Sequence, residues 1–436
     1  MRNEAGLPQR CDIFCNVIDN YGDIGVCWRL ARQLAHEFGL QVRLWVDDLG
    51  SFAKLCPEAD AVLESQHQRG VEIRRWRDPF PEVQPAGLVI EAFGCKLPQS
   101  YVEAMAQTSK QSVPEAKMDA RRQGIAEGDS TERYSEGGDA AANNADASPV
   151  VRKPVWINLE YLSAEDWVHG CHRLPSPHSS LPLTKYFFFP GFTKQTGGLL
   201  LERDLLARRD AFLGDVAQRQ AYWQSLGLAM PEADTLKISL FAYENAALAG
   251  LFDAWANGQQ PVLCLVPEGR VLPQVGEYFG DAESCAGKGY RRGSLEVQVL
   301  PFVEQERYDE LLWACDVNFV RGEDSCVRAQ WAGKPFVWQI YPQHDAVHWE
   351  KLQAFLSLYS ASLSPAASEA VQGLWREWNG EGAAGAAWLA YAAVSGELDA
   401  RAQDWARELA KNNLALNLLD FYQEIGRMRA FEIEGQ

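Results

Sequence analysis

The sequence contains no apolar run close to the ~20 residues of a membrane-spanning helix, and residues 1–20 lack the apolar core of a secretion signal. No two of the ten cysteines have CxxC spacing. The spacing therefore does not indicate a zinc or dithiol motif, and free, buried thiols in a reducing compartment are the expectation. We expect a cytoplasmic protein with no membrane partner.

Basic residues are also few: 41 Lys and Arg stand against 59 Asp and Glu, giving a net charge of −18. Such a surface repels phosphate backbones and anionic lipid, so we expect no nucleic-acid partner. A protein partner that presents a cationic group suits the sign of the charge. Solubility alone is the other explanation for an acidic composition.

With 436 residues, 47% of them hydrophobic, the chain is long enough for two to three domains. Short β-rich runs alternate with helical patterns in two successive halves, which predicts the α/β class with two doubly wound, Rossmann-like domains. The predicted boundaries are 1–184 for the first domain and 185–400 for the second. Residues 401–436 are expected to form a helical segment that packs back on the first domain. Within the first domain, 107–149 is poor in apolar residues and is predicted to be a disordered insertion.

An acidic turn, IDNYGDIG, follows the first predicted strand, Cys11 to Asp19. Asp23 comes four residues after Asp19, just before a helix, and Asn20-Tyr21-Gly22 between them can bring both carboxylates to the end of the sheet. Two neighbouring carboxylates suit general-base chemistry or the binding of a cation. The alternative is structural: Asp23 as an N-cap and Asp19 as a turn former.

A second polar turn, Arg321-Gly322-Glu323-Asp324-Ser325, lies between a buried strand and a helix. A helix N-terminus offers free N–H groups to a diphosphate, Arg321 adds a phosphate donor, and Ser325 adds a hydroxyl at the expected cap. Glu323 and Asp324 do not suit an anionic ligand, so they are expected to point elsewhere, toward sugar hydroxyls or an acceptor substrate. An ordinary helix start is the alternative.

Aromatic and amide side chains follow two further strands of the second half: Phe241 and Tyr243 after one, Phe302 and Gln305 after the other. Aromatic rings can sandwich a base or sugar, and an amide can pair with a base edge. The two phenylalanines could equally be core residues. The sequence has no DxD pair, and His344 and His348 lack a clear third ligand, so we predict no metal and no cofactor.

IDNYGDIG, FFFPGF and RGEDS followed by WAGKPFVWQIYPQ occur in this order in the chain. In these motifs it resembles the EarP family of elongation factor P–arginine rhamnosyltransferases, which have the GT-B fold. The resemblance implies an inverting, metal-independent glycosyltransferase that moves L-rhamnose from dTDP-β-L-rhamnose to an arginine of elongation factor P. It implies that 1–184 is the acceptor-binding domain and 185–400 the nucleotide-sugar-binding domain. It also implies catalytic roles for Asp19, Asp23 (as general base) and Glu323. The implied substrate-binding residues are Asn20, Tyr21, Gly22, Phe241, Tyr243, Phe302, Gln305, Arg321, Gly322, Asp324 and Ser325.

Two alternatives remain open at this stage. One is another GT-B enzyme that uses a different sugar nucleotide. The other is a non-catalytic module that binds a nucleotide sugar or a protein, for which the paired aspartates would be dispensable.

Overall fold

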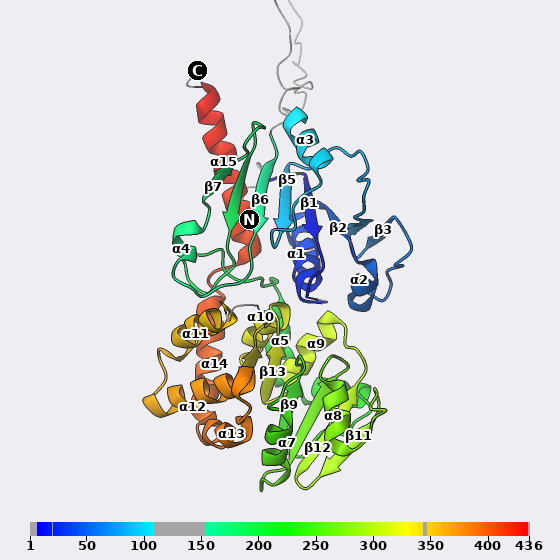
Figure 1. The fold of residues 1–436 in the computed structure, drawn as a ribbon, viewed down its shortest axis with the longest axis vertical. Helices are drawn as coiled ribbons and strands as arrows, with labels where there is room; N and C mark the ends of the chain where they lie inside the picture. Colours follow the sequence, from blue (N-terminus) through cyan, green and yellow to red (C-terminus); the bar gives the residue numbers. More distant parts are fainter. Residues whose placement is uncertain (1–6, 20, 109–152, 343–346, 435–436) are drawn as a thin grey trace, which may run out of the picture.

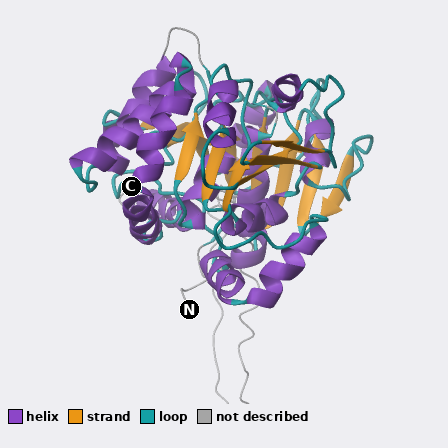
Figure 2. Ribbon diagram, turned by 90° about the horizontal axis from the view of Figure 1, so that it is seen from below, coloured by secondary structure: helices purple, strands orange, loops and turns teal. Residues whose placement is uncertain are grey.

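The computed structural model describes residues 7–19, 21–108, 153–342 and 347–434. Figure 1 shows two halves, one above the other, each built around its own sheet. Figure 2 shows helices on both sides of the strands. The predicted α/β class, with two Rossmann-like domains, is confirmed.

The N-terminal sheet is parallel except where β3 pairs with β4 and β7 with β8. Across the sheet, the described strands are β3 (Ser65–Gln68), β4 (Val71–Arg75), β2 (Gln41–Val46), β1 (Arg10–Cys15), β5 (Leu88–Ala92), β6 (Val155–Leu159), β8 (Thr184–Phe188) and β7 (Pro175–Pro177). The helices of this half are α1 (Gly22–Phe38), α2 (Leu49–Leu55), α3 (Gln99–Thr108) and α4 (Val168–Cys171). Helix α1 ends at Gly39, whose φ of 70° favours glycine.

The C-terminal sheet is parallel except for its edge strand β11. Its order is β11 (Gly289–Arg292), β12 (Leu295–Leu300), β10 (Val262–Pro267), β9 (Leu236–Leu240), β13 (Val317–Arg321) and β14 (Phe336–Gln339). The helices packed around it are α5 (Leu205–Gly214), α6 (Val216–Ser225), α7 (Leu248–Ala256), α8 (Leu272–Phe279), α9 (Gln305–Ala314), α10 (Asp324–Ala332), α11 (Val347–Ser360), α12 (Pro365–Arg376), the π-helix Glu377–Glu381, α13 (Ala384–Ala393) and α14 (Ser395–Leu409).

The domain boundaries differ in detail from those expected from sequence. Strand β8 pairs with β6, so the N-terminal sheet extends to Phe188 rather than stopping at residue 184. The predicted insertion at 107–149 begins inside α3, and from residue 109 onward it lies outside the described residues. No helix among the described residues is long and apolar enough to cross a membrane. All ten cysteines are free.

The C-terminal helical segment divides between the two domains. Helix α14 packs into the C-terminal core through Trp405 and Leu409. The 21-residue α15 (Leu414–Glu434) packs into the N-terminal core through residues such as Leu418, and Figure 1 shows it running alongside that half. The chain therefore returns to the first domain between residues 409 and 414.

The two crossings between the domains lie side by side. Leu199 N–H donates to Asn412 O at 3.2 Å, and Leu414 N–H donates to Leu199 O at 2.9 Å. Gly198, with φ of 80°, is required here because a β-carbon would lie 2.2 Å from Asn412 O. This pairing ties the two connecting segments to one another.

Candidate active site

The first strand is shorter than predicted, and the acidic turn is a loop beyond it. Strand β1 ends at Cys15, where its parallel partner β2 also ends, at Val46. Val17 N–H then donates to Asp47 Oδ1 at 2.9 Å and not to a neighbouring strand. Asp19 therefore lies four residues beyond the sheet edge, in the space between the two domains.

Asp23 fixes the shape of this loop. Its Oδ2 accepts the N–H groups of Ile18 and Asp19, both at 2.9 Å, and the residue is 3% exposed. Burial raises the pKa of Asp23, although these two hydrogen bonds oppose the shift. Tyr21 occupies the N-cap of α1, so Asp23 is not the cap that the structural alternative required.

Asp19 contacts the C-terminal domain. Its Oδ2 accepts the Tyr243 hydroxyl at 2.6 Å, and its Oδ1 lies 3.9 Å from Arg321 Nη1. A β-carbon at Gly22 or at Gly322 would lie 2.8 Å from the same Oδ2, and Gly322 has φ of 58°. The acidic turn and the Arg321 turn, far apart in sequence, therefore meet at one carboxylate.

Arg321 ends β13 and is buried, yet part of its guanidinium has no hydrogen-bond partner. The guanidinium carbon lies 4.5 Å from the ring centre of Phe241 and 4.4 Å from that of Tyr243. Among the described residues nothing accepts a hydrogen bond from Nε or Nη1. Unsatisfied buried donors are costly, so these two nitrogens point to an anionic ligand.

The Arg321 guanidinium lines a cavity between the two domains. The predicted residues that line it are Asp19, Tyr21, Gly22, Phe241, Phe302, Gln305, Arg321, Asp324 and Ser325, joined by Arg29, Leu55, Pro267, Glu268, Val303 and Tyr308. Tyr21 and Phe302 both line this cavity, and their ring centres lie 4.9 Å apart. Tyr243 is not a lining residue of this cavity; its ring contacts the Arg321 guanidinium and its hydroxyl donates to Asp19.

A second cavity, of about 150 Å³, lies on the other side of Asp19 and Gly22. Asp19, Asp23 and Glu323 all line it, so the three predicted catalytic carboxylates share one space. Both oxygens of Glu323 accept the Leu162 N–H, at 3.0 and 3.1 Å. Burial raises the pKa of Glu323 to about 8.

Comparison with known proteins identifies the family. The profile described as "Elongation-Factor P (EF-P) rhamnosyltransferase EarP" matches residues 11–115 and 139–423. The protein-arginine rhamnosyltransferase of Pseudomonas putida KT2440 is 49% identical over 413 residues, covering 94% of this chain and 98% of the relative. The one from Pseudomonas aeruginosa PAO1 is 44% identical, covering 95% and 98%. The chain belongs to the EarP family.

A solved structure agrees with this assignment. It is described as the structural basis for EarP-mediated arginine glycosylation of translation elongation factor EF-P. It is 36% identical to this chain, covers 95% of it and 98% of the solved chain, and superimposes with a TM-score of 0.61. This member of the EarP family is therefore a glycosyltransferase with two Rossmann-like domains in the GT-B arrangement.

Some of the predicted roles in this EarP-family site take a different form. Ser325 is not the helix cap: Glu323 is, and the Ser325 hydroxyl accepts Arg321 N–H at 3.0 Å while donating to Arg321 O. Asn20 lies outside the described residues. Within the described part of the chain no group of three or more His, Cys, Asp or Glu side chains could hold a metal ion.

Gln305 and Asp324 line the cavity but also bond across the domain interface. Gln305 Nε2 donates to Gly25 O at 3.0 Å. Asp324 Oδ1 accepts Arg29 Nε at 3.0 Å. A β-carbon on Gly25 would lie 3.2 Å from both side chains, so helix α1 approaches α10 closely here. The two residues therefore hold the domains together as well as facing the cavity.

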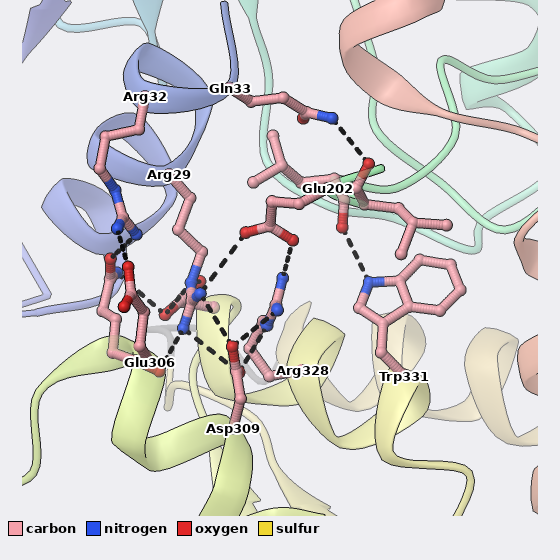
Figure 3. A network of polar contacts seen from close by, with 12 residues as sticks. Arg29, Arg32, Gln33, Glu202, Glu306, Asp309, Arg328 and Trp331 are labelled. Carbon is pink, nitrogen blue, oxygen red and sulfur yellow. Dashed lines mark hydrogen bonds and ion pairs between the residues drawn. The ribbon is translucent and has the colours of Figure 1, made fainter. Parts of the chain in front are cut away.

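A buried ionic network that the sequence analysis missed extends this contact (Figure 3). Arg29 Nη1 lies 3.3 Å from Asp309 and 3.6 Å from Glu202. Arg328 binds the same two acids, Asp309 with two bonds of 2.8 Å and Glu202 at 2.6 Å. The arginine side chains are both 1% exposed. Two positive and three negative side chains, including Asp324, thus join α1, the connecting segment, α9 and α10.

The connecting segment beside Glu202 is also held from both domains (Figure 3). Gln33 of α1 donates to Leu201 O at 2.7 Å, and Trp331 of α10 donates to Leu200 O at 2.8 Å. The only sequence signal for this cluster is charge on otherwise apolar helix faces. Its partners are too far apart in sequence for spacing to pair them.

Proposed function

We propose that this EarP-family enzyme transfers L-rhamnose from dTDP-β-L-rhamnose to an arginine side chain of elongation factor P, with inversion and without a metal ion. The observation that carries the proposal is the junction at Asp19. On one side lies a cavity lined by Arg321, whose Nε and Nη1 donate no hydrogen bond within the described residues, and on the other a cavity lined by three carboxyl groups. An anionic donor and a cationic acceptor would thus meet at one point.

Arg321 binds the donor's diphosphate. Its guanidinium is held against two aromatic rings, and Nε and Nη1 each have a hydrogen-bond donor left for a phosphate oxygen. The N-terminus of α10 adds a positive dipole end. The Phe302 and Tyr21 rings are placed to contact the base or sugar. These groups stabilise the negative charge that develops on dTDP as it leaves, which is the work a metal ion performs in other enzymes.

The carboxylates activate the acceptor. A guanidinium is a poor nucleophile because its lone pairs are delocalised and its pKa is above about 12. Asp19 and Glu323 orient it, and Asp23, whose pKa burial raises, takes the proton as the nitrogen attacks C1 of the sugar. A carbon–nitrogen bond forms, the bond from C1 to the phosphate oxygen breaks with its electron pair leaving on dTDP, and the anomeric centre inverts.

The acidic surface, with a net charge of −18, favours a cationic protein segment over nucleic acid or anionic membrane as the partner. Since elongation factors act in the cytoplasm, the proposal also places the enzyme there.

Intact-mass analysis of elongation factor P incubated with the enzyme and dTDP-L-rhamnose tests the proposal. We expect a gain of one deoxyhexose. An unchanged mass would contradict the proposed donor or the proposed acceptor.

Asp23→Asn should abolish transfer while donor affinity, measured by calorimetry, stays within a few-fold of the wild type. Arg321→Ala should weaken donor binding by roughly tenfold or more, because charge-assisted hydrogen bonds are each worth about 1.5–3 kcal/mol. Unchanged turnover in Asp23→Asn would remove Asp23 from the role of base.

A further inference from the structure

Two aromatic rings that the sequence analysis did not select lie in the carboxylate-lined cavity. Phe93 follows β5 and Tyr161 follows β6, so both stand at the carboxyl ends of adjacent parallel strands, where open α/β sheets bind ligands. The rings are stacked, with centres 4.7 Å apart and planes at 20°. Phe93 has φ of 56°, a conformation that is unfavourable for a residue with a β-carbon. Strain of this kind is concentrated at functional sites.

Tyr161 is close to all three carboxylates across the cavity. Burial raises the pKa of its hydroxyl, and the negative charges of Asp23, Glu323 and Asp19 raise it further. Tyr161 therefore presents an aromatic ring to a space that the side chains of Asp19, Asp23 and Glu323 also line. Such a space favours a cation that can lie flat against a ring.

A cation of the protein itself already lies against this ring. Lys351 of α11 lines the cavity, and its Nζ lies 5.7 Å from the centre of the Tyr161 ring, within the range of a cation–π contact. The same ammonium lowers the pKa of Glu323 against the effect of burial. Lysine has a flexible four-carbon chain, so its head group can leave this position without movement of the backbone.

We propose that the face of Tyr161, supported by Phe93, is the binding position of the acceptor's guanidinium, and that Lys351 occupies it until the acceptor enters. This inference rests on the proposed function, since it concerns the arginine acceptor of the same site. A planar guanidinium can stack on the ring while donating bidentate hydrogen bonds to the carboxylates, and an ammonium cannot do both. The ring therefore selects arginine over lysine, and Lys351 competes with the substrate.

The test uses Tyr161→Leu, Tyr161→Phe and Lys351→Met, with Lys54→Met, an exposed residue of α2, as a matched control. The measurements are KM and kcat for elongation factor P, the affinity of the enzyme for elongation factor P in the presence of dTDP, and its affinity for the donor. Tyr161→Leu should raise the acceptor KM roughly 3- to 30-fold, the range of a cation–π contact. Tyr161→Phe, which keeps the ring, should stay within about twofold of the wild type. Lys351→Met should lower the KM, and Lys54→Met should not change it.

Donor affinity serves as the folding control, because Tyr161 does not line the donor cavity. An unchanged acceptor KM in Tyr161→Leu, or a raised one in Lys351→Met, overturns the proposal.

The affinity measurement separates the proposed binding position from the proposed function. If the wild type transfers no sugar but Tyr161→Leu still weakens binding of the factor, the binding position stands and the proposed function fails. If transfer occurs and Tyr161→Leu changes neither the KM nor the affinity for elongation factor P, the proposed function stands and the binding position fails.

Discussion

Replacing Arg29 by methionine tests whether the buried ionic network holds the two domains together. Arg29 has three acidic partners: Asp324 at 3.0 Å, Asp309 at 3.3 Å and Glu202 at 3.6 Å. After the substitution Asp309 and Glu202 keep Arg328, but Asp324 loses its ion pair with Arg29 although its side chain is only 17% exposed. Breaking a buried pair by removing one partner costs about 3–5 kcal/mol. Because one acid rather than three is left uncompensated, we expect the lower end, about 3 kcal/mol.

The assay is urea unfolding followed by tryptophan fluorescence, together with small-angle scattering of the folded protein. Arg29→Met should lower the free energy of unfolding and enlarge the radius of gyration, because the lost contacts join one domain to the other. Arg32→Met is the matched control one helical turn away. Its partners are the half-exposed Glu306 and the uncharged Gln305 amide oxygen, so the loss should be about 1 kcal/mol or less. Equal losses in the two variants, or an Arg29 variant as compact and stable as the wild type, would contradict a role of the network in holding the domains together.

Two further predictions concern the carboxylates of the site. Gly22→Ala should lower kcat roughly 100-fold, because the added β-carbon would lie 2.8 Å from Asp19 Oδ2 and displacements near 1 Å have that effect. Gly373→Ala, whose β-carbon meets nothing within 4 Å, is the control; equal rates in both variants would show that Asp19 tolerates the shift. Glu323→Gln should melt above the wild type at pH 9, with a gap that shrinks toward pH 6. Its pKa rises on folding from 4.5 to about 8, so its contribution to stability is full below about pH 4.5 and is lost as the pH rises through about 8. A gap that does not change between pH 6 and pH 9 would contradict the buried, protonated state.

Local pattern was sufficient to predict most of the strands and helices. Alternating β-rich and helical runs correctly indicated two Rossmann-like sheets. These features depend on backbone preference and on apolar periodicity within a few residues, which the sequence records directly. Where an element's end depends on a distant partner the prediction was wrong: β1 stops at Cys15 because Asp47 takes the next hydrogen bond.

The same division applies to the C-terminal helices. Residues 401–436 were expected to form a helical segment that packs back on the first domain. In the structure Trp405 and Leu409 belong to α14 and pack in the C-terminal core, while Leu419 belongs to α15 and packs in the N-terminal core. The helical pattern was correct, but it carries no information on which core receives each segment.

The residue types of the site can be read from the chain alone: an acidic turn before one helix and an Arg–Ser turn before another. Folding brings both turns together at Asp19, sets the Tyr243 hydroxyl against that carboxylate, and adds Phe93 and Tyr161 to the second cavity. The difference is one of range along the chain. Capping, turns and periodicity act between neighbours in the chain, whereas a buried ion pair such as Arg29–Asp324 joins residues 295 positions apart and exists only once both domains have folded and closed.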